Sequence, residues 1–350
     1  MSRHTVVRAP IALVAIVVTL LAMTVPAFAQ EPVTRLDGGG TPAGDAVAWS
    51  QASFADGSAP DVIITRDDDF ADALASGAVQ GLLTAPLLLT NTNALSPEAA
   101  AEITRLGATN AIVLGLEAAV APAVVTELEG MGLTTERIGG PTRLETAVNI
   151  VNRFFPNATA ITLARAFGTD TDPTQAFADS LALGPYDAVT NIPTLLTETD
   201  TLSGPTAAAL AALPVQWVTV VGGGDAISQG VEAAAAAAID DGVDATDETV
   251  ERIAGGNRFA TAVALSNDLG YTTAADASRV ILSEGQNDGA WTSGFPAGVQ
   301  AGNDAATVLA NGDALPSETL DFITGASVPL ICGPGVSEAA CDAAAEAING

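Results

Sequence analysis

The sequence contains no lysine, and its only histidine is His4. Without a histidine in the body of the chain there is no Ser-His-Asp triad and no Cys-His pair, and zinc hydrolases lose their usual ligands. The lack of lysine excludes a Walker-type phosphate lysine and a Schiff base. Only the chemistry of carboxylates remains, as in glycosidases. We therefore expect either that chemistry or no catalysis, without a metal site or a cofactor.

Positive charge is scarce in the rest of the composition as well. The 350 residues include 12 basic residues, all Arg, against 41 Asp and Glu, a net charge of −29. Loss of Arg3 and Arg8 with a leader would change this balance to −31. So acidic a surface excludes ordinary nucleic-acid binding, which needs basic patches against phosphate. Apolar residues make up 48% of the chain at regular spacing, so the composition does not indicate disorder.

The first 29 residues are typical of a secretory signal peptide. Arg3, His4 and Arg8 precede the apolar run 11–23, and Ala27-Phe28-Ala29 forms an A-x-A cleavage site. The run is shorter than the ~20 residues that a membrane span needs, so we expect cleavage after Ala29 rather than a retained anchor. Since no later segment could span a membrane, the sequence predicts an exported protein that is soluble or held non-covalently at the surface.

Cys332 and Cys341 are the only cysteines. In an exported protein an even pair favours a disulfide, which would contribute about 2–3 kcal/mol by closing a short loop. Two buried thiols remain the alternative.

One motif occurs twice and divides the chain. Residues 137–148 and 252–263 both read Arg-Ile-x-Gly-x-x-Arg-x-x-Thr-Ala-Val. A weaker copy begins at Arg35, and it lacks the second Arg and the Thr. These starts predict three repeats, each opened by the motif. We place them at residues 30–132 (with a degenerate start), 133–247 and 248–350.

Each repeat alternates helices with short apolar runs. The first runs are 62–65, 160–163 and 280–282, and they lack the polar alternation of a half-exposed strand, which suits parallel strands buried on both faces. Strict alternation of strand and helix indicates an α/β fold of three tandem parallel-sheet repeats. Asp72 and Asp179 follow the first run in repeats one and two, at a predicted helix start. In repeat three we align Ser293 with these two acids.

The scarce Arg residues gather in the motif, where they are the best candidates for a site. A guanidinium forms bidentate bonds to carboxylate or phosphate, and in this chain its first partner is expected to be one of the protein's own acids, such as Asp72 or Asp179. A role in packing between repeats and a role in ligand contact both remain open. The candidate polymer-binding or inter-repeat residues are Arg137, Arg143, Thr146, Arg252, Arg258, Thr261, Asp72 and Asp179.

Taken in order, these motifs resemble the cell wall binding repeat 2 modules of bacterial surface proteins. Residues 137–232 match nearly every element, 252–350 match the opening, and 35–128 match from Phe70 onward. The resemblance implies parallel α/β modules used in threes about a pseudo-threefold axis. It also implies non-covalent attachment to anionic cell-wall polymers.

The sequence thus predicts a secreted, non-catalytic protein of the cell wall or cell surface. Its expected partner is an anionic cell-wall polymer or peptidoglycan, held in grooves between neighbouring repeats. One alternative is a cell-wall hydrolase, either amidase-like or a carboxylate glycosidase, or a modifier of such an enzyme. Another is a structural surface-layer component. Because the first motif copy is degenerate, we expect the second and third copies to dominate binding.

Overall fold

The computed structural model describes residues 31–350 except 241, 243–247 and 303. The predicted signal peptide, residues 1–29, lies outside the described residues and stays a prediction. Residues from Glu31 onward form one compact unit. Within the described part, no helix is both long and apolar enough to cross a membrane.

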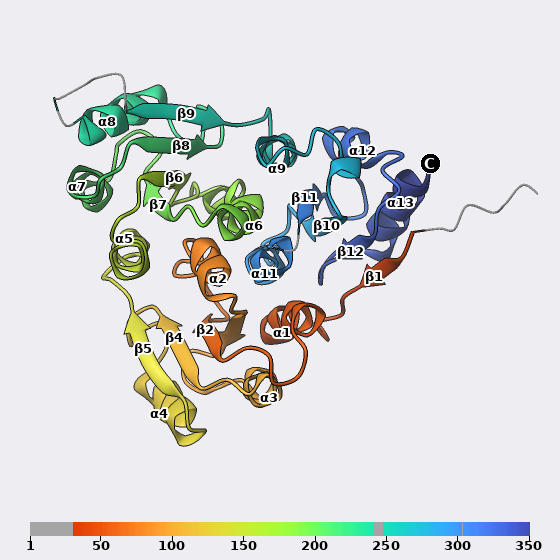
Figure 1. The fold of residues 1–350 in the computed structure, drawn as a ribbon, viewed down its shortest axis with the longest axis horizontal. Coiled ribbons are helices and arrows are strands. Elements are labelled where there is room, and N and C mark those ends of the chain that lie inside the picture. The colour runs from red at the N-terminus through yellow and green to blue at the C-terminus, as the bar shows by residue number, and fades with distance from the viewer. Residues whose placement is uncertain (1–30, 241, 243–247, 303) are drawn as a thin grey trace, which may run out of the picture. The chain divides into compact units, whose positions relative to one another are not determined.

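The described chain folds into three four-stranded sheets that share one strand order (Figure 1). Sheet one contains β2 (Asp61–Arg66), β3 (Leu87–Thr90), β4 (Asn110–Leu114) and β5 (Thr134–Ile138), in the order β3-β2-β4-β5. Sheet two contains β6 (Ala160–Arg165), β7 (Thr194–Thr197), β8 (Trp217–Val221) and β9 (Thr249–Ile253), in the order β7-β6-β8-β9. Sheet three contains β10 (Arg279–Glu284), β11 (Ala305–Ala310), β12 (Leu330–Cys332) and β1 (Val33–Arg35), in the order β11-β10-β12-β1. All pairs are parallel, which confirms the predicted α/β class with three parallel sheets.

Helices connect the strands, and each sheet with its helices is called a unit below. Unit one has α1 (Pro42–Ser53), α2 (Gly77–Leu83), α3 (Pro97–Leu106) and α4 (Pro122–Gly130). Unit two has α5 (Arg143–Phe154), the 3-10 helix η1 (Pro173–Ala176), α6 (Ser180–Thr190), α7 (Gly204–Ala212) and α8 (Gln229–Ile239). Unit three has α9 (Arg258–Asp268), η2 (Ala274–Asp276), α10 (Trp291–Gly294), α11 (Gly298–Ala301), α12 (Ser317–Ile323) and α13 (Glu338–Asn349).

The repeated motif crosses from one unit to the next. Arg137 and Ile138 end β5, the edge strand of sheet one, whereas the α5 helix that follows packs against β7 of sheet two. The second copy likewise ends β9 and continues into α9, which packs against β11. The motif predicted to open a repeat therefore has its strand in one sheet and its helix on the next. Consequently the first two sheets end a strand later than the predicted repeats 30–132 and 133–247.

The N-terminal strand closes this series. β1 pairs with β12 of sheet three, with Thr34 opposite Ile331, while α1 packs against β3 of sheet one. A disulfide between Cys332 and Cys341 joins β12 to α13 beside this pairing. Each unit thereby contacts the other two, as a pseudo-threefold arrangement requires.

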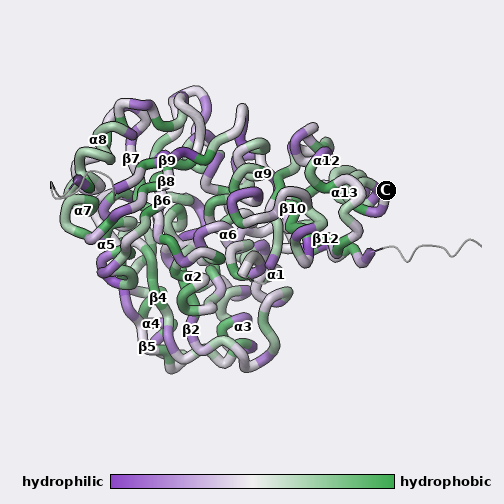
Figure 2. The backbone as a smooth tube through the Cα atoms, turned by 45° about the horizontal axis from the view of Figure 1, so that its top comes forward, coloured by the Kyte–Doolittle hydropathy of each residue, from purple (hydrophilic) through white to green (hydrophobic). Residues whose placement is uncertain are grey.

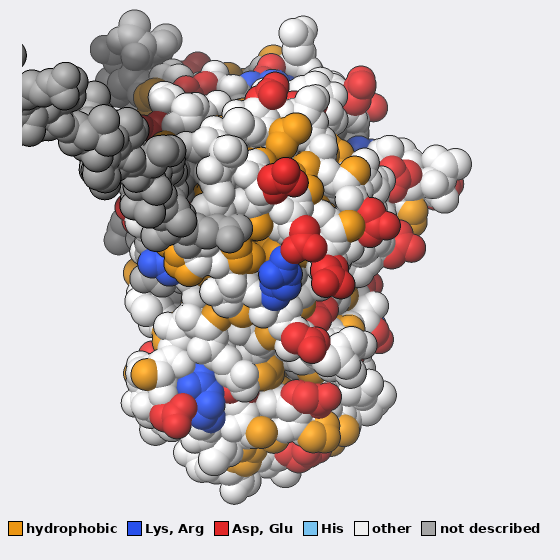
Figure 3. All heavy atoms as spheres, turned by 90° about the vertical axis from the view of Figure 1, so that its right-hand side faces the viewer, with side chains coloured by type: hydrophobic (Ala, Val, Ile, Leu, Met, Phe, Trp, Pro, Cys, Tyr) orange, Lys and Arg blue, Asp and Glu red, His pale blue; other side chains and the backbone are white. Residues whose placement is uncertain are grey.

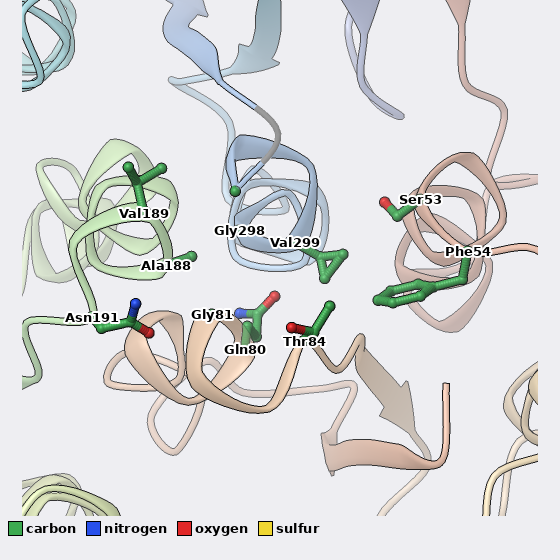
Figure 4. A pocket seen from close by; sticks show the side chains of 11 residues that line it. Ser53, Phe54, Gln80, Gly81, Thr84, Ala188, Val189, Asn191, Gly298 and Val299 are labelled. Atoms are coloured by element: carbon green, nitrogen blue, oxygen red, sulfur yellow. The ribbon is translucent and has the colours of Figure 1, made fainter. Parts of the chain in front are cut away.

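Three short helices, α2, α6 and α11, meet where the units come together (Figure 1). Glycine permits this approach, because a Cβ on Gly77 would lie 2.5 Å from the carbonyl oxygen of Gly184. A pocket of about 280 Å³ remains beside these helices, with Gln80, Thr84 and Val299 among its lining (Figure 4). None of its lining residues is charged.

The apolar core runs through all three units. One cluster of buried side chains includes Ile63 from unit one, Leu181 from unit two and Leu309 from unit three. Figure 2 shows the hydrophobic character of the central strands. Further clusters lie within each unit, and because this one is shared by all three, the units stabilise one another.

Candidate functional site

The units meet at three junctions, and two of them carry the same pair of polar side chains. At the junction of units one and two, Thr146 Oγ1 on α5 donates to Asp72 Oδ1 at 2.8 Å. At the junction of units two and three, Thr261 on α9 faces Asp179, and its Oγ1 donates to the Asn257 carbonyl at 3.2 Å. Asp72 lies in the turn before α2 and Asp179 is the residue before α6, so both mark the entry to a central helix. The structure thus brings these four candidates together in two pairs.

The third junction carries a different contact between an Asp and a Thr. Thr292 Oγ1, at the entry to unit three's central segment, donates to Asp45 Oδ2 on α1 at 2.7 Å. Ser293 occupies the place of Asp72 and Asp179, as aligned: a Cβ on Gly333 would lie 2.9 Å from Ser293 Oγ, just as Gly115 and Gly222 face those two carboxylates. Sequence reasoning missed Asp45, although it falls on the Thr position of the motif once the extra Gly40 is allowed for.

Ser293 serves the same junction through an aromatic ring. Its Oγ accepts a hydrogen bond from Trp49 Nε1 at 3.0 Å, and Trp49 is fully buried between units one and three. A buried indole needs a partner for its N–H, and a hydroxyl from the neighbouring unit supplies it.

Arg137 and Arg252 hold loops within their own sheets. Arg137 donates from Nη1 to the Gly115 carbonyl at 2.7 Å and from Nη2 to the Val120 carbonyl at 2.8 Å. Arg252 repeats the pattern on Gly222 and Ile227. These carbonyls flank the loop between a strand and the next helix, so both guanidiniums stabilise that loop.

The two glycines in these loops are required by their surroundings. Gly115 has φ +97° and Gly222 has φ +104°, a conformation that other residues rarely adopt. A Cβ on Gly115 would also lie 2.5 Å from Asp72 Oδ2, and one on Gly222 would meet Asp179. The loops held by Arg137 and Arg252 therefore pack directly on the junction carboxylates.

Arg143 and Arg258, at the starts of α5 and α9, lie at the junctions themselves. Arg143 Nη1 donates to the Ala166 carbonyl at 2.8 Å, and its guanidinium stacks on Phe70 of unit one and on Phe167. Arg258 Nη1 donates to the Gly285 carbonyl at 2.8 Å. Each thus links its helix to the end of the first strand in the same sheet.

The expected ion pairs between these motif Arg residues and Asp72 or Asp179 are absent among the described residues. Arg143 approaches only Asp69, at 3.9 Å, and Arg252 pairs with Glu232 at 2.7 Å. The reason is geometric: the carboxylates face the Thr side chains of the covering helix, while the guanidiniums bond to backbone carbonyls.

Burial at the junctions changes the acidity of the carboxyl groups. Desolvation raises the pKa of Asp45, Asp72 and Asp179, against the opposing effect of their hydrogen bonds to Thr. A raised pKa means that the folded state binds more protons than the unfolded state just above the ordinary Asp value of about 3.9. This contribution to stability is complete below that value and is lost as pH rises through the folded-state pKa.

We therefore expect Asp179→Asn, which is neutral at every pH, to flatten the dependence of unfolding free energy on pH between about 4 and 7. The difference from wild type should be on the order of 1 kcal/mol across this range, because one pKa unit corresponds to 1.36 kcal/mol. Urea unfolding at several pH values measures it. Asp276→Asn is the control. Backbone hydrogen bonds lower the pKa of Asp276, so the contribution of this residue to the unfolding free energy rises with pH, whereas that of Asp179 falls. Parallel wild-type and Asp179→Asn profiles would contradict the assignment.

Two junctions open into surface pockets in corresponding places. The pocket between units two and three has a volume of about 520 Å³, and its lining includes Arg165, Asp179 and Arg258. The pocket between units three and one has a volume of about 620 Å³, and its lining includes Asp45 and Thr292. Both combine one unit's strand-to-helix loop with the next unit's motif, so the predicted grooves between repeats have physical counterparts.

Acidic residues gather in the loops 67–69 and 170–172, after the first strands of units one and two. Among the described residues, no three His, Cys, Asp or Glu side chains are grouped so as to hold an ion. Asp68 instead pairs with Arg66 at 2.5 Å, and Asp172 bonds to Thr174.

Comparison with known proteins agrees with this architecture. The family model described as Cell wall binding domain 2 (CWB2) matches residues 38–125 and 137–232, which together make up just over half of the chain. Two solved structures share the fold. Cwp8 from Clostridium difficile superposes with a TM-score of 0.75 at 24% identity, covering 91% of this chain and 52% of that one. Cwp6 from the same organism gives 0.76 at 16% identity, covering 92% and 48%.

Curated relatives include two proteins of Bacillus subtilis (strain 168). The N-acetylmuramoyl-L-alanine amidase LytC is 27% identical over 212 residues, which are 60% of this chain and 40% of the relative. The Amidase enhancer is 28% identical over 198 residues, 57% of this chain and 24% of the relative. The chain thus spans less than half the length of either relative.

Proposed function

Because the chain belongs to the cell wall binding domain 2 family, we propose that it is a secreted, non-catalytic protein that attaches non-covalently to cell-wall polymers. The pockets at the unit junctions are the proposed binding sites. The observation that carries the proposal is their construction, since each pocket is lined by one unit's loop and by the motif that begins the next unit's helix. Polymer binding then depends on all three units being closed on one another.

A non-catalytic role is supported by the chemistry of the junctions. Asp72 accepts from Thr146, Asp45 accepts from Thr292, and Asp179 faces Thr261, so each junction carboxyl lies against a Thr side chain. Glycosidases use a pair of carboxyl groups about 5–10 Å apart across the scissile bond. The amidase named among the relatives is more than twice as long as the matched region, and its activity is not transferred to this chain.

The surface charge affects how a polymer is approached. Figure 3 shows acidic side chains spread over one face, with few basic side chains between them. At low ionic strength this field repels an anionic polymer, and salt screens it with a Debye length of about 8 Å at 0.15 M. Binding through recessed pockets at moderate salt is compatible with such a surface.

Filling both pockets should abolish wall binding. A Cβ on Gly256 meets no atom within 4 Å, and one on Gly289 meets nothing closer than 3.6 Å, so Leu fits at either position without backbone strain. Gly256 lines the pocket between units two and three, and Gly289 lines the pocket between units three and one. We expect the Gly256→Leu, Gly289→Leu double variant to lose at least tenfold in co-sedimentation with purified cell walls.

Gly130→Leu is the matched control, since Gly130 also meets nothing within 4 Å and lies at the end of α4, outside both pockets. Wild-type sedimentation by the double variant would contradict the pocket assignment. Release of soluble peptidoglycan fragments by the wild-type chain would contradict the non-catalytic role. Assembly of the pure protein into sheets, seen by electron microscopy, would favour a structural surface-layer role instead.

A further inference from the structure

The pocket between units two and three contains positive charge that the protein itself does not pair. Arg165 from the end of β6 and Arg258 from the start of α9 both line it. Among the described residues, neither guanidinium has a carboxylate oxygen within 4.0 Å, although the chain carries 41 acidic residues. In so acidic a protein, two neighbouring unpaired Arg residues require an explanation.

The hydrogen-bond acceptors of these two residues are all uncharged. Arg165 Nη1 donates to Gln175 Oε1 at 3.0 Å, and its buried Nε has no hydrogen-bond partner. Arg258 donates to the Gly285 carbonyl and to Thr174 Oγ1, at 2.8 and 3.2 Å. Burial lowers the pKa of both guanidiniums, so part of their hydration is lost without an opposite charge in contact to replace it. An unpaired, partly buried cation is costly unless an anion joins it.

In units one and three, the residue that corresponds to Arg165 is either an Arg paired with an acid or is itself an acid. The last residue of the first strand is Arg66 in unit one and Glu284 in unit three, each in the same register as Arg165. Arg66 pairs with Asp68 at 2.5 Å, and Glu284 accepts backbone hydrogen bonds, including one from Gln286.

The residue at the helix start differs between junctions too. Pro42 stands in α1 where Arg258 stands in α9. Arg143 occupies this place in α5, but it is stacked on two Phe rings, and its side chain is only 16% exposed. Within the part of the chain that the structure describes, only the junction of units two and three therefore offers two uncompensated guanidiniums to a pocket.

The acids near this pocket are engaged with other groups. Asp179 is buried against Thr261, and Asp172 accepts from the backbone N–H and the hydroxyl of Thr174. Asp225 also lines the pocket, and Asp200 and Glu284 act on the two guanidiniums from beyond ion-pair distance. These acids favour a ligand with one compact anionic group over a densely charged one.

We propose that this pocket binds a single oxyanion of a cell-wall polymer, a phosphate or a carboxylate, between Arg165 and Arg258, and that the other two junctions bind no such group. The inference rests on the proposed function and adds the ligand chemistry and the position of the site. Guanidinium forks suit both oxyanions, because two parallel N–H donors match two oxygens. The glycine-bearing loops at 222–224 and 255–256 let a bulky sugar approach the backbone closely.

Calorimetric titration tests the proposal with two defined probes, a glycerol phosphate oligomer and a galacturonate oligomer. We expect the wild-type chain to bind at least one probe with a single site per chain. Arg165→Gln, which loses only the contact to Gln175, should weaken that binding at least tenfold, and Arg165→Lys should weaken it less. Arg153→Gln removes the same charge from the exposed Arg153–Glu136 pair and should bind like wild type.

Adding Arg258→Gln to Arg165→Gln should remove probe binding, with circular dichroism confirming that the variants remain folded. The proposal is overturned if Arg165→Gln binds the probe as tightly as wild type, or if the wild-type chain binds neither probe yet sediments with cell walls. In both cases the proposed function stands. Failure of the wild-type chain to sediment with walls would instead refute the proposed function.

Discussion

Replacing Thr292 by Asp should destabilise the protein by about 2–4 kcal/mol, and adding Asp45→Thr should restore most of that loss. The single change places two carboxylates in contact at a partly buried junction, where like charges about 4 Å apart repel by roughly 4 kcal/mol at an effective dielectric constant of 20. The double variant exchanges the two residues, so one carboxylate and one hydroxyl again face each other across this junction.

Urea unfolding of the two single variants and the double variant gives the coupling energy directly, and we expect about 2 kcal/mol. The single variant Thr292→Asp should also regain stability as pH falls, because protonating either carboxyl removes the repulsion. Additive effects of the two substitutions would show that positions 45 and 292 do not interact in the folded protein.

The second large effect concerns Trp49. Its replacement by Ala should lower the unfolding free energy by about 3–5 kcal/mol, since a fully buried indole leaves a cavity that its neighbours fill only in part. Trp49→Phe keeps an aromatic ring but loses the hydrogen bond to Ser293. We expect the lost hydrogen bond to cost about 1 kcal/mol, in addition to a packing loss smaller than that of Trp49→Ala. Trp217→Ala is the matched control, because Trp217 is 43% exposed and should cost far less.

Both Trp49 variants should unfold in one transition if the three units share one core. A separate early transition confined to unit one would contradict the shared core. Tyrosine fluorescence can report on the other two units, since Tyr186 lies in α6 and Tyr271 follows α9.

The α/β class and most strands could be predicted from sequence because their residues are buried on both faces. Residues 62–65 and 160–163 are unbroken apolar runs in the sequence and lie in the buried β2 and β6. The capping box from Thr142 to Glu145 was equally readable and is present at the start of α5. At these positions the local sequence pattern and the burial in the folded protein favour the same residue types, so the pattern alone is informative.

The sheet to which the motif strand belongs could not be predicted. β5 is a half-exposed edge strand in which only Ile138 is buried, so its pattern carries little information about its partner. The contact of Asp45 with Thr292 could not be predicted, because it joins residues 247 positions apart and Asp45 follows the degenerate copy of the motif. Arg165 was overlooked since it lies outside the repeated motif, and only the structure shows it beside Arg258.

The pairing of β1 with β12 also determines when the molecule can be completed. Thr34 is among the first described residues to be synthesised and Ile331 is among the last, so this pair can form only when synthesis is nearly complete. At about 5–20 residues per second, the roughly 300 intervening residues take at least 15 seconds to synthesise. Throughout that time sheet three lacks its edge strand and the junction of Asp45 with Thr292 cannot form. Folding of this chain is therefore a late event dominated by contacts distant in sequence, and an incomplete chain keeps its first strand unpaired.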